Sequence, residues 1–145
     1  MSHYTSLVLS LEPNPAWYPK TAEEVAACID RNYDYVDELE NKEERIEGFL
    51  KYAEEFFAKR INSRCLEFNI KAYQKHMEQF GCNFAIPAER IHTFLHSFTG
   101  YGDYPVVSAI GSSYLSFRAF LFDTFITSKA DKVKIYILDA YDVHA

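Results

Sequence analysis

The chain has 145 residues, of which 48% are hydrophobic and 25% are charged, and its net charge at pH 7 is −6. A chain of this length builds one hydrophobic core without disulfides or a structural metal, so we expect a single domain over residues 1–145. The composition excludes disordered and fibrous proteins. The acidic balance argues against direct binding of nucleic acid, which depends on neutralising phosphates with Lys and Arg.

The cysteines and the apolar runs bear on location. Cys28, Cys65 and Cys82 are an odd number with no paired or zinc-ribbon spacing, which favours reduced thiols in a reducing compartment. No apolar run approaches the roughly 18 residues that a transmembrane helix needs. The N-terminus has only a short apolar stretch, Leu7 to Leu11, with no preceding basic region and no cleavage-like site, which argues against a secretory signal. We therefore expect a cytoplasmic protein without a membrane partner.

A strand and a helix are the first elements expected along the chain. Leucines alternate with other residues over 4–11, which predicts a half-buried strand. Thr21 and Glu24 have the spacing of a capping box, so a helix begins near residue 21. Apolar residues on one face predict that this helix extends to about Asn41: Val25, Ile29, Val36 and Leu39.

Three further helices are expected in the middle of the chain. Residues 46–57 continue the apolar period as a second helix or as an extension of the first, and the polar run 40–45 favours a break near Asn41. Residues 66–80 have helical spacing and end at Gly81, although alternation over 66–72 is also consistent with a strand. Pro87 begins a short helix that extends to residue 98.

The C-terminal third is the most apolar part. Residues 106–126 are buried whatever their secondary structure; the first half weakly favours a helix, and the second leads to a strand ending near Thr127. A turn at 128–131 then joins a β-branched strand at 132–141. The predicted fold class is α+β: a small, mainly antiparallel sheet from the N- and C-terminal segments, with several central helices packed on one face.

One helix carries a candidate metal site. Glu89, His92 and His96 project within about 60° of one another on the helix at 87–98, which is a spacing that can hold zinc or iron. The competing interpretation is the polar face of an amphipathic helix. No HExxH, CxxC, nucleotide-binding loop or nucleophile motif accompanies these residues, so we expect no catalytic residues and no cofactor, with a divalent metal here as the one alternative.

Acidic residues are concentrated in one part of the chain. Residues 1–60 hold 13 acidic and 7 basic side chains, whereas residues 61–145 hold 8 of each. On the helix expected from residue 21, an outward face carries Asp30, Asp34, Asp37 and Glu38. The like-charge pair Asp30 and Asp34 costs about 0.2–0.5 kcal/mol, which hints at a task other than folding. A merely solvated face is the competing interpretation.

An aromatic loop is a second candidate for partner binding. Tyr101, Asp103 and Tyr104 lie beside two glycines, and amphipathic aromatics are well suited to anchoring contacts. An ordinary connection between elements is the alternative.

These patterns favour a small interaction protein. We expect an inhibitor that docks its carboxylate- and Tyr-bearing helical face on a basic protein partner, such as one that handles nucleic acid, with DNA mimicry as the sharpest form. A metal-dependent enzyme or ligand-binding domain using Glu89, His92 and His96 is one alternative. A structural homodimer subunit is another, because aromatics make up 17% of the chain.

Overall fold

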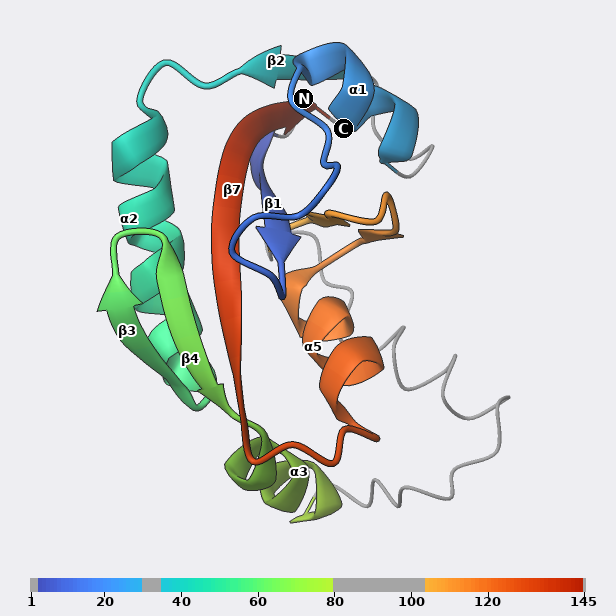
Figure 1. Cartoon of the computed structure of the whole chain (residues 1–145). Helices are drawn as coiled ribbons and strands as arrows, with labels where there is room; N and C mark the ends of the chain where they lie inside the picture. The colour runs from blue at the N-terminus through green and yellow to red at the C-terminus, as the bar shows by residue number, and fades with distance from the viewer. Residues whose placement is uncertain (1–2, 30–34, 80–103, 145) are drawn as a thin grey trace.

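The computed structural model describes residues 3–29, 35–79 and 104–144, and strand β7 (Lys132–His144) runs through its middle (Figure 1). Strand β1 (His3–Ser10) pairs antiparallel with β7, from His3 opposite His144 to Ser10 opposite Tyr136, with a bulge between Val8 and Leu9. Both strands expected at the ends of the chain are therefore confirmed, and they form the centre of the sheet.

Two strands share the other edge of β7. Strand β4 (Cys65–Asn69) pairs with its first part, and strand β2 (Tyr35–Glu38) pairs with its last part. Strand β3 (Ala58–Asn62) extends the sheet beyond β4, while β5 (Val106–Ser108) and β6 (Ser113–Tyr114) extend it beyond β1. Among the strands described, only β1 and β5 pair in parallel. The fold is α+β with a mainly antiparallel sheet, as predicted.

Helices pack on this sheet, and two of them begin at residues whose side chains cap the helix start. The elements are α1 (Ala22–Cys28), α2 (Lys42–Ala53), the 3-10 turn η1 (Glu54–Phe56), α3 (Ile70–Gln79) and α5 (Phe117–Phe125). The Thr21 hydroxyl accepts a hydrogen bond from the Glu24 N–H at 3.1 Å, and the Ser116 hydroxyl accepts one from the Ala119 N–H at 3.1 Å. Each bond satisfies an N–H at a helix start that has no partner within the helix.

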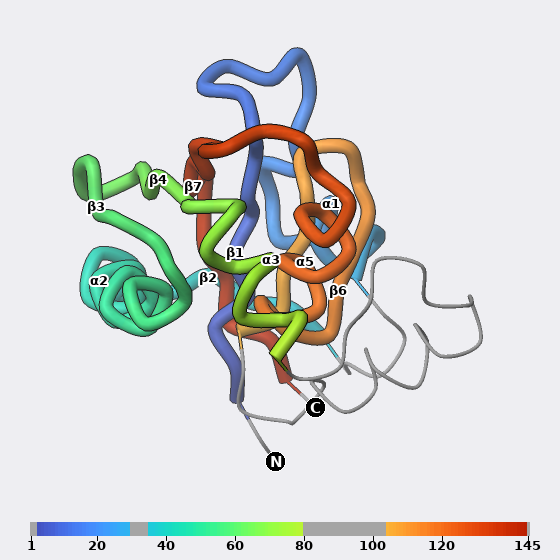
Figure 2. Tube along the Cα trace, turned by 90° about the horizontal axis from the view of Figure 1, so that it is seen from below, coloured from blue at the N-terminus to red at the C-terminus, as the bar shows by residue number. Residues whose placement is uncertain are grey.

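Both faces of the sheet are covered. Helices α2 and α5 meet over one face, where the rings of Phe49 and Phe117 lie 4.9 Å apart and Leu7, Leu9, Ile135 and Ile137 are buried. Helix α1 covers a smaller cluster on the other face, formed by Val8, Val25, Val107 and Tyr141. Seen from below, α2 and the β3–β4 hairpin lie to one side of β7, and α5 and β6 lie to the other (Figure 2).

The helix expected from residue 21 to Asn41 is too long. Helix α1 ends at Cys28, Ile29 has an extended backbone, and residues 35–38 form β2. The predicted apolar stripe still faces inward in part, because Val25 is buried in the smaller cluster and Ile29 and Val36, which are partly buried, pack against it. The expected break near Asn41 is confirmed, since Asn41 is the N-cap residue of α2.

Two other segments divide differently from the prediction. Residues 65–69 form a strand and residues 70–79 a helix, so the two competing interpretations of this region apply to successive parts of it. Residues 106–126 reverse the expected order, because the strands β5 and β6 come first and helix α5 follows. The strand expected to end near Thr127 is therefore wrong. The Ser116 cap favours this helix, and its apolar residues recur at helical spacing.

Candidate functional site

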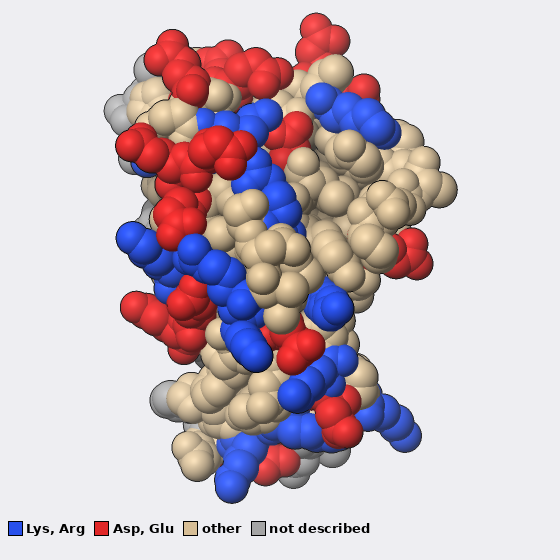
Figure 3. Space-filling view, turned by 60° about the vertical axis from the view of Figure 1, so that its left-hand side comes forward, with Lys and Arg blue, Asp and Glu red and all other residues tan. Residues whose placement is uncertain are grey.

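Exposed carboxylates gather at one end of the molecule. They come from α1, from β2 with the loop that follows it, and from the first turn of α2: Glu23, Glu24, Asp37, Glu38, Glu40, Glu43 and Glu44. In the surface view, red acidic side chains crowd this end, at the top, while acidic and basic side chains alternate further down (Figure 3). We call these seven residues the acidic end.

Some of these carboxylates have a role in folding. Glu23 and Glu24 lie in the first turn of α1, and Glu43 and Glu44 in that of α2, where negative charge stabilises a helix dipole. Glu43 also pairs with Arg64, whose hydrogen bond and charge lower the pKa of that carboxyl. Asp37, Glu38 and Glu40 do not lie at a helix start, because they belong to strand β2 and the loop after it.

The structure changes how the predicted acidic residues are arranged. Asp37 and Glu38 are consecutive residues of β2, so they point to opposite faces of the sheet instead of sharing a helix face. Asp37 lies opposite Asp142 and Glu38 lies opposite Tyr141 in the pairing with β7. Asp30 and Asp34 lie outside the described residues.

A groove of about 630 Å³ opens at the acidic end. Its walls come from the start of β1, the end of β7, the segment 37–41 and α2. Three of the carboxylates lining it, Asp37, Glu38 and Glu40, are exposed, and Arg45 is the basic side chain that lines it. The groove therefore offers mainly negative charge to whatever enters it.

Two histidines and an aspartate meet in this groove. Pairing of β1 with β7 places His3 opposite His144, and residues opposite each other share a face, as do residues 142 and 144 along β7. Asp142 Oδ2 lies 3.1 Å from His3 Nδ1 and 3.2 Å from His144 Nε2. Asp37 Oδ2, from β2, lies 3.4 Å from His144 Nε2. We call His3, Asp142 and His144 the histidine cluster.

His144 is the buried member of the histidine cluster. Its side chain is only 6% exposed, its ring stacks on Tyr35 at 4.0 Å between centroids, and the His3 ring meets it edge-on at 4.0 Å. Although two carboxylates approach Nε2, neither ring nitrogen has a hydrogen bond of acceptable geometry within the described part of the chain. A buried polar group left in this state costs about 1–3 kcal/mol.

The histidine cluster was missed by the sequence analysis. His3 lies 139 residues from Asp142 in the chain, so no local motif contains all three residues. One signal was available: His3 directly precedes the first expected strand, and Asp142 and His144 alternate just beyond the last one. Antiparallel pairing of those two strands would have brought the three side chains together.

The other sequence-predicted site residues fall mostly outside the described chain. Glu89, His92 and His96 lie there, as do Tyr101 and Asp103. Tyr104 is described and is half-buried, with its ring 5.1 Å from both Phe49 and Tyr52. Burial raises the pKa of the Tyr104 hydroxyl. Tyr104, which was predicted to lie in an aromatic binding loop, therefore packs against the core.

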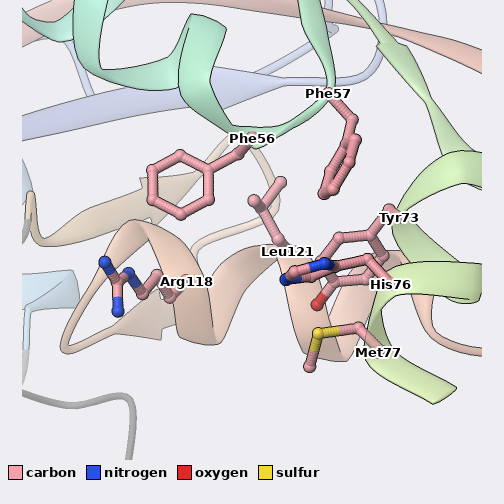
Figure 4. A pocket seen from close by; sticks show the side chains of 7 residues that line it. All are labelled: Phe56, Phe57, Tyr73, His76, Met77, Arg118 and Leu121. Atoms are coloured by element: carbon pink, nitrogen blue, oxygen red, sulfur yellow. The ribbon is translucent and has the colours of Figure 1, made fainter. Parts of the chain in front are cut away.

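An apolar pocket of about 300 Å³ lies toward the end that carries α3 (Figure 4). Phe56 and Phe57 come from the segment after α2, and the remaining wall comes from α3 and α5: Tyr73, His76, Met77, Arg118 and Leu121. The Arg118 guanidinium lies 5.1 Å from the centre of the Phe56 ring. This pocket suits an apolar group with few polar contacts.

A third hollow, of about 570 Å³, is flanked by exposed apolar side chains. Leu11, Trp17 and Ile110 line it, and Ile110 is 86% exposed.

Within the described residues, no helix is both long and apolar enough to cross a bilayer. No protein-family model, curated protein or solved structure matches this chain.

Proposed function

We propose that this chain is a cytoplasmic interaction protein, an inhibitor that docks its acidic end on the basic surface of a protein that handles nucleic acid. The observation that carries the proposal is the exposed set Asp37, Glu38 and Glu40, which lies beside the groove and has no role at a helix start. Proteins that bind nucleic acid offer the complementary basic surface.

The groove gives the docking face a shape as well as a charge. Lys and Arg side chains are long and carry their charge at the tip, so they reach into a hollow of about 630 Å³ lined by Glu38 and Glu40. Tyr35, which is 45% exposed, adds an aromatic surface next to the carboxylates. Complementary charge of this kind mainly accelerates association and selects the partner.

A second explanation for the same charges has to be separated from this one. In the described structure, β2 pairs with β7 alone, and charged side chains on such an edge strand discourage pairing with another chain. Neutralising Glu38 and Glu40 would then cause aggregation without affecting any partner. Light scattering of the variant distinguishes the two.

The test is zero-length cross-linking of carboxylates to lysines in a lysate of the source cells, followed by mapping of the linked residues. We expect linkages from the acidic end to lysines of one basic protein. That protein should associate about threefold to tenfold more slowly with the variant Glu38→Gln, Glu40→Gln, and more slowly at 500 mM than at 50 mM salt.

The matched control is Glu12→Gln, Glu55→Gln, which removes two exposed charges elsewhere on the molecule. It should bind like the wild type. Equal binding by the wild type, the Glu38/Glu40 variant and the control, or linkages confined to other faces, would contradict the proposal. Recovery of no partner at 50 mM salt would also count against it.

A homodimer is a second candidate function, favoured by the exposed residues Leu11, Trp17 and Ile110 around one hollow. Large exposed apolar patches often mark protein interfaces. Sedimentation of the wild type and of Trp17→Ser across a range of concentrations tests it. A monomer at all concentrations excludes this candidate.

A further inference from the structure

The donor atoms of the histidine cluster are spaced like the ligands of a metal ion. Zinc bonds of about 2.0–2.2 Å in a tetrahedral arrangement place neighbouring donor atoms about 3.3–3.6 Å apart. Asp142 Oδ2 lies 3.1 Å and 3.2 Å from the two imidazole nitrogens. All three donor atoms lie within 4.8 Å of one another, and the His3 side chain, which is 56% exposed, leaves the cluster accessible from solvent.

The surroundings of His144 also call for a ligand. Its Nε2 faces the carboxylates of Asp142 and Asp37 without a well-formed hydrogen bond, and its ring is fixed by stacking on Tyr35. A metal ion bound at Nε2 would satisfy that nitrogen and occupy the space between it and the carboxylates. The sheet holds the ring in place before any ion arrives, because His144 and Tyr35 are directly paired across β7 and β2.

The local charge suits a divalent cation. Two neutral imidazoles and the carboxylates of Asp142 and Asp37 sum to two negative charges, which a divalent ion balances. Lys42 is engaged elsewhere, since it pairs with Asp139 at 2.6 Å, and Arg45 is one of the side chains that line the groove. Imidazole and carboxylate together favour zinc and its transition-metal neighbours over calcium or magnesium.

We propose that His3, Asp142 and His144 bind one divalent transition-metal ion, with zinc as the preferred ion and Asp37 as the neighbouring carboxylate that completes the charge balance. The ion ties the start of β1 to the end of β7, and it draws β2 to them through Asp37. This site does not depend on the proposed docking function, and each can fail without the other.

The experiment uses the untagged full chain, stripped of metal with a chelator and titrated with Co²⁺ and Zn²⁺. We expect one equivalent of Co²⁺ to bind, with visible absorption bands that Zn²⁺ abolishes, and Zn²⁺ should raise the melting temperature by mass action. His3→Ala and Asp142→Asn should each weaken binding about tenfold or more, because each removes a ligand. Circular dichroism verifies that both variants fold, and His3 is exposed enough for its variant to do so.

The control variant is His92→Ala, His96→Ala, which removes the two histidines of the segment 87–98. It should bind metal like the wild type. Binding lost in this variant but kept in His3→Ala and Asp142→Asn would overturn the proposal and assign the metal to residues 87–98. Absence of binding in the wild type at about 100 μM Zn²⁺, or full affinity in both ligand variants, would also overturn it.

Discussion

Truncation of Ile135 to alanine tests whether β7 is the central strand of the core. Ile135 is fully buried, and it lies opposite Leu66 in the pairing of β7 with β4. The substitution removes three carbon atoms, worth about 2.4 kcal/mol at about 0.8 kcal/mol per buried methylene, and the cavity left behind raises the loss of stability to about 3–4 kcal/mol. The exposed neighbour Lys134 provides the control Lys134→Ala, which should change stability by less than about 0.5 kcal/mol.

Urea unfolding followed by far-ultraviolet circular dichroism measures the effect of Ile135→Ala. With a slope of about 2 kcal/mol per molar urea, the midpoint should fall by about 1.5–2 M while the slope stays unchanged. Trp17 is too exposed to report on the core by fluorescence, so the backbone signal is the better probe. A loss below about 1 kcal/mol would refute the central position of β7.

Two further predictions concern α5 and its neighbour β6. Ser116→Ala should destabilise the protein by about 1–2 kcal/mol in the same urea assay, because it removes the buried hydroxyl that accepts a hydrogen bond from the Ala119 N–H at the start of α5. The exposed control Ser112→Ala should have little effect on stability. Equal effects of the two substitutions would contradict the capping role. Burial, and then the hydrogen bond that its hydroxyl donates to Asp123 at 2.7 Å, raise the pKa of Tyr114 to about 12. The folded pKa lies above the unfolded value of about 10, so the stability that Tyr114 contributes is fully present below pH 10 and is lost as pH rises through 12. The difference between the ultraviolet titrations of wild type and Tyr114→Phe measures this pKa, Asp123→Asn should lower it, and a pKa near 10 would contradict the described packing.

Elements with local signals were predictable from the sequence. The alternation of residues 4–11 and 132–141 identified β1 and β7, and the pair Thr21 and Glu24 marked the start of α1. The polar run 40–45 indicated a break near Asn41, and Asn41 is the N-cap residue of α2. In each case the residues that determine the local structure lie close together in the sequence.

Strand β2 was not predictable in the same way. Val36 has helical spacing from Val25 and Ile29, so the sequence is compatible with a helix. A strand places Val36 against the same cluster when residues 35–38 pair with the edge of β7. The choice depends on hydrogen bonds to residues 141–144, which are more than 100 positions away. The histidine cluster escaped prediction for the same reason, since the register of β1 against β7 brings it together.

Strand β7 has a consequence for how the chain folds during synthesis. It is the last described segment to leave the ribosome, yet β1, β2 and β4 all pair with it. Until residues 132–144 emerge, the apolar residues Leu7, Val8 and Leu9 of β1 have no completed sheet in which to be buried. Pairing between segments so distant in sequence is slow, and the exposed strands are open to aggregation in the meantime. The central sheet therefore forms only after residues 132–144 have emerged, and until then the unpaired apolar strands are the kind of surface that chaperones bind.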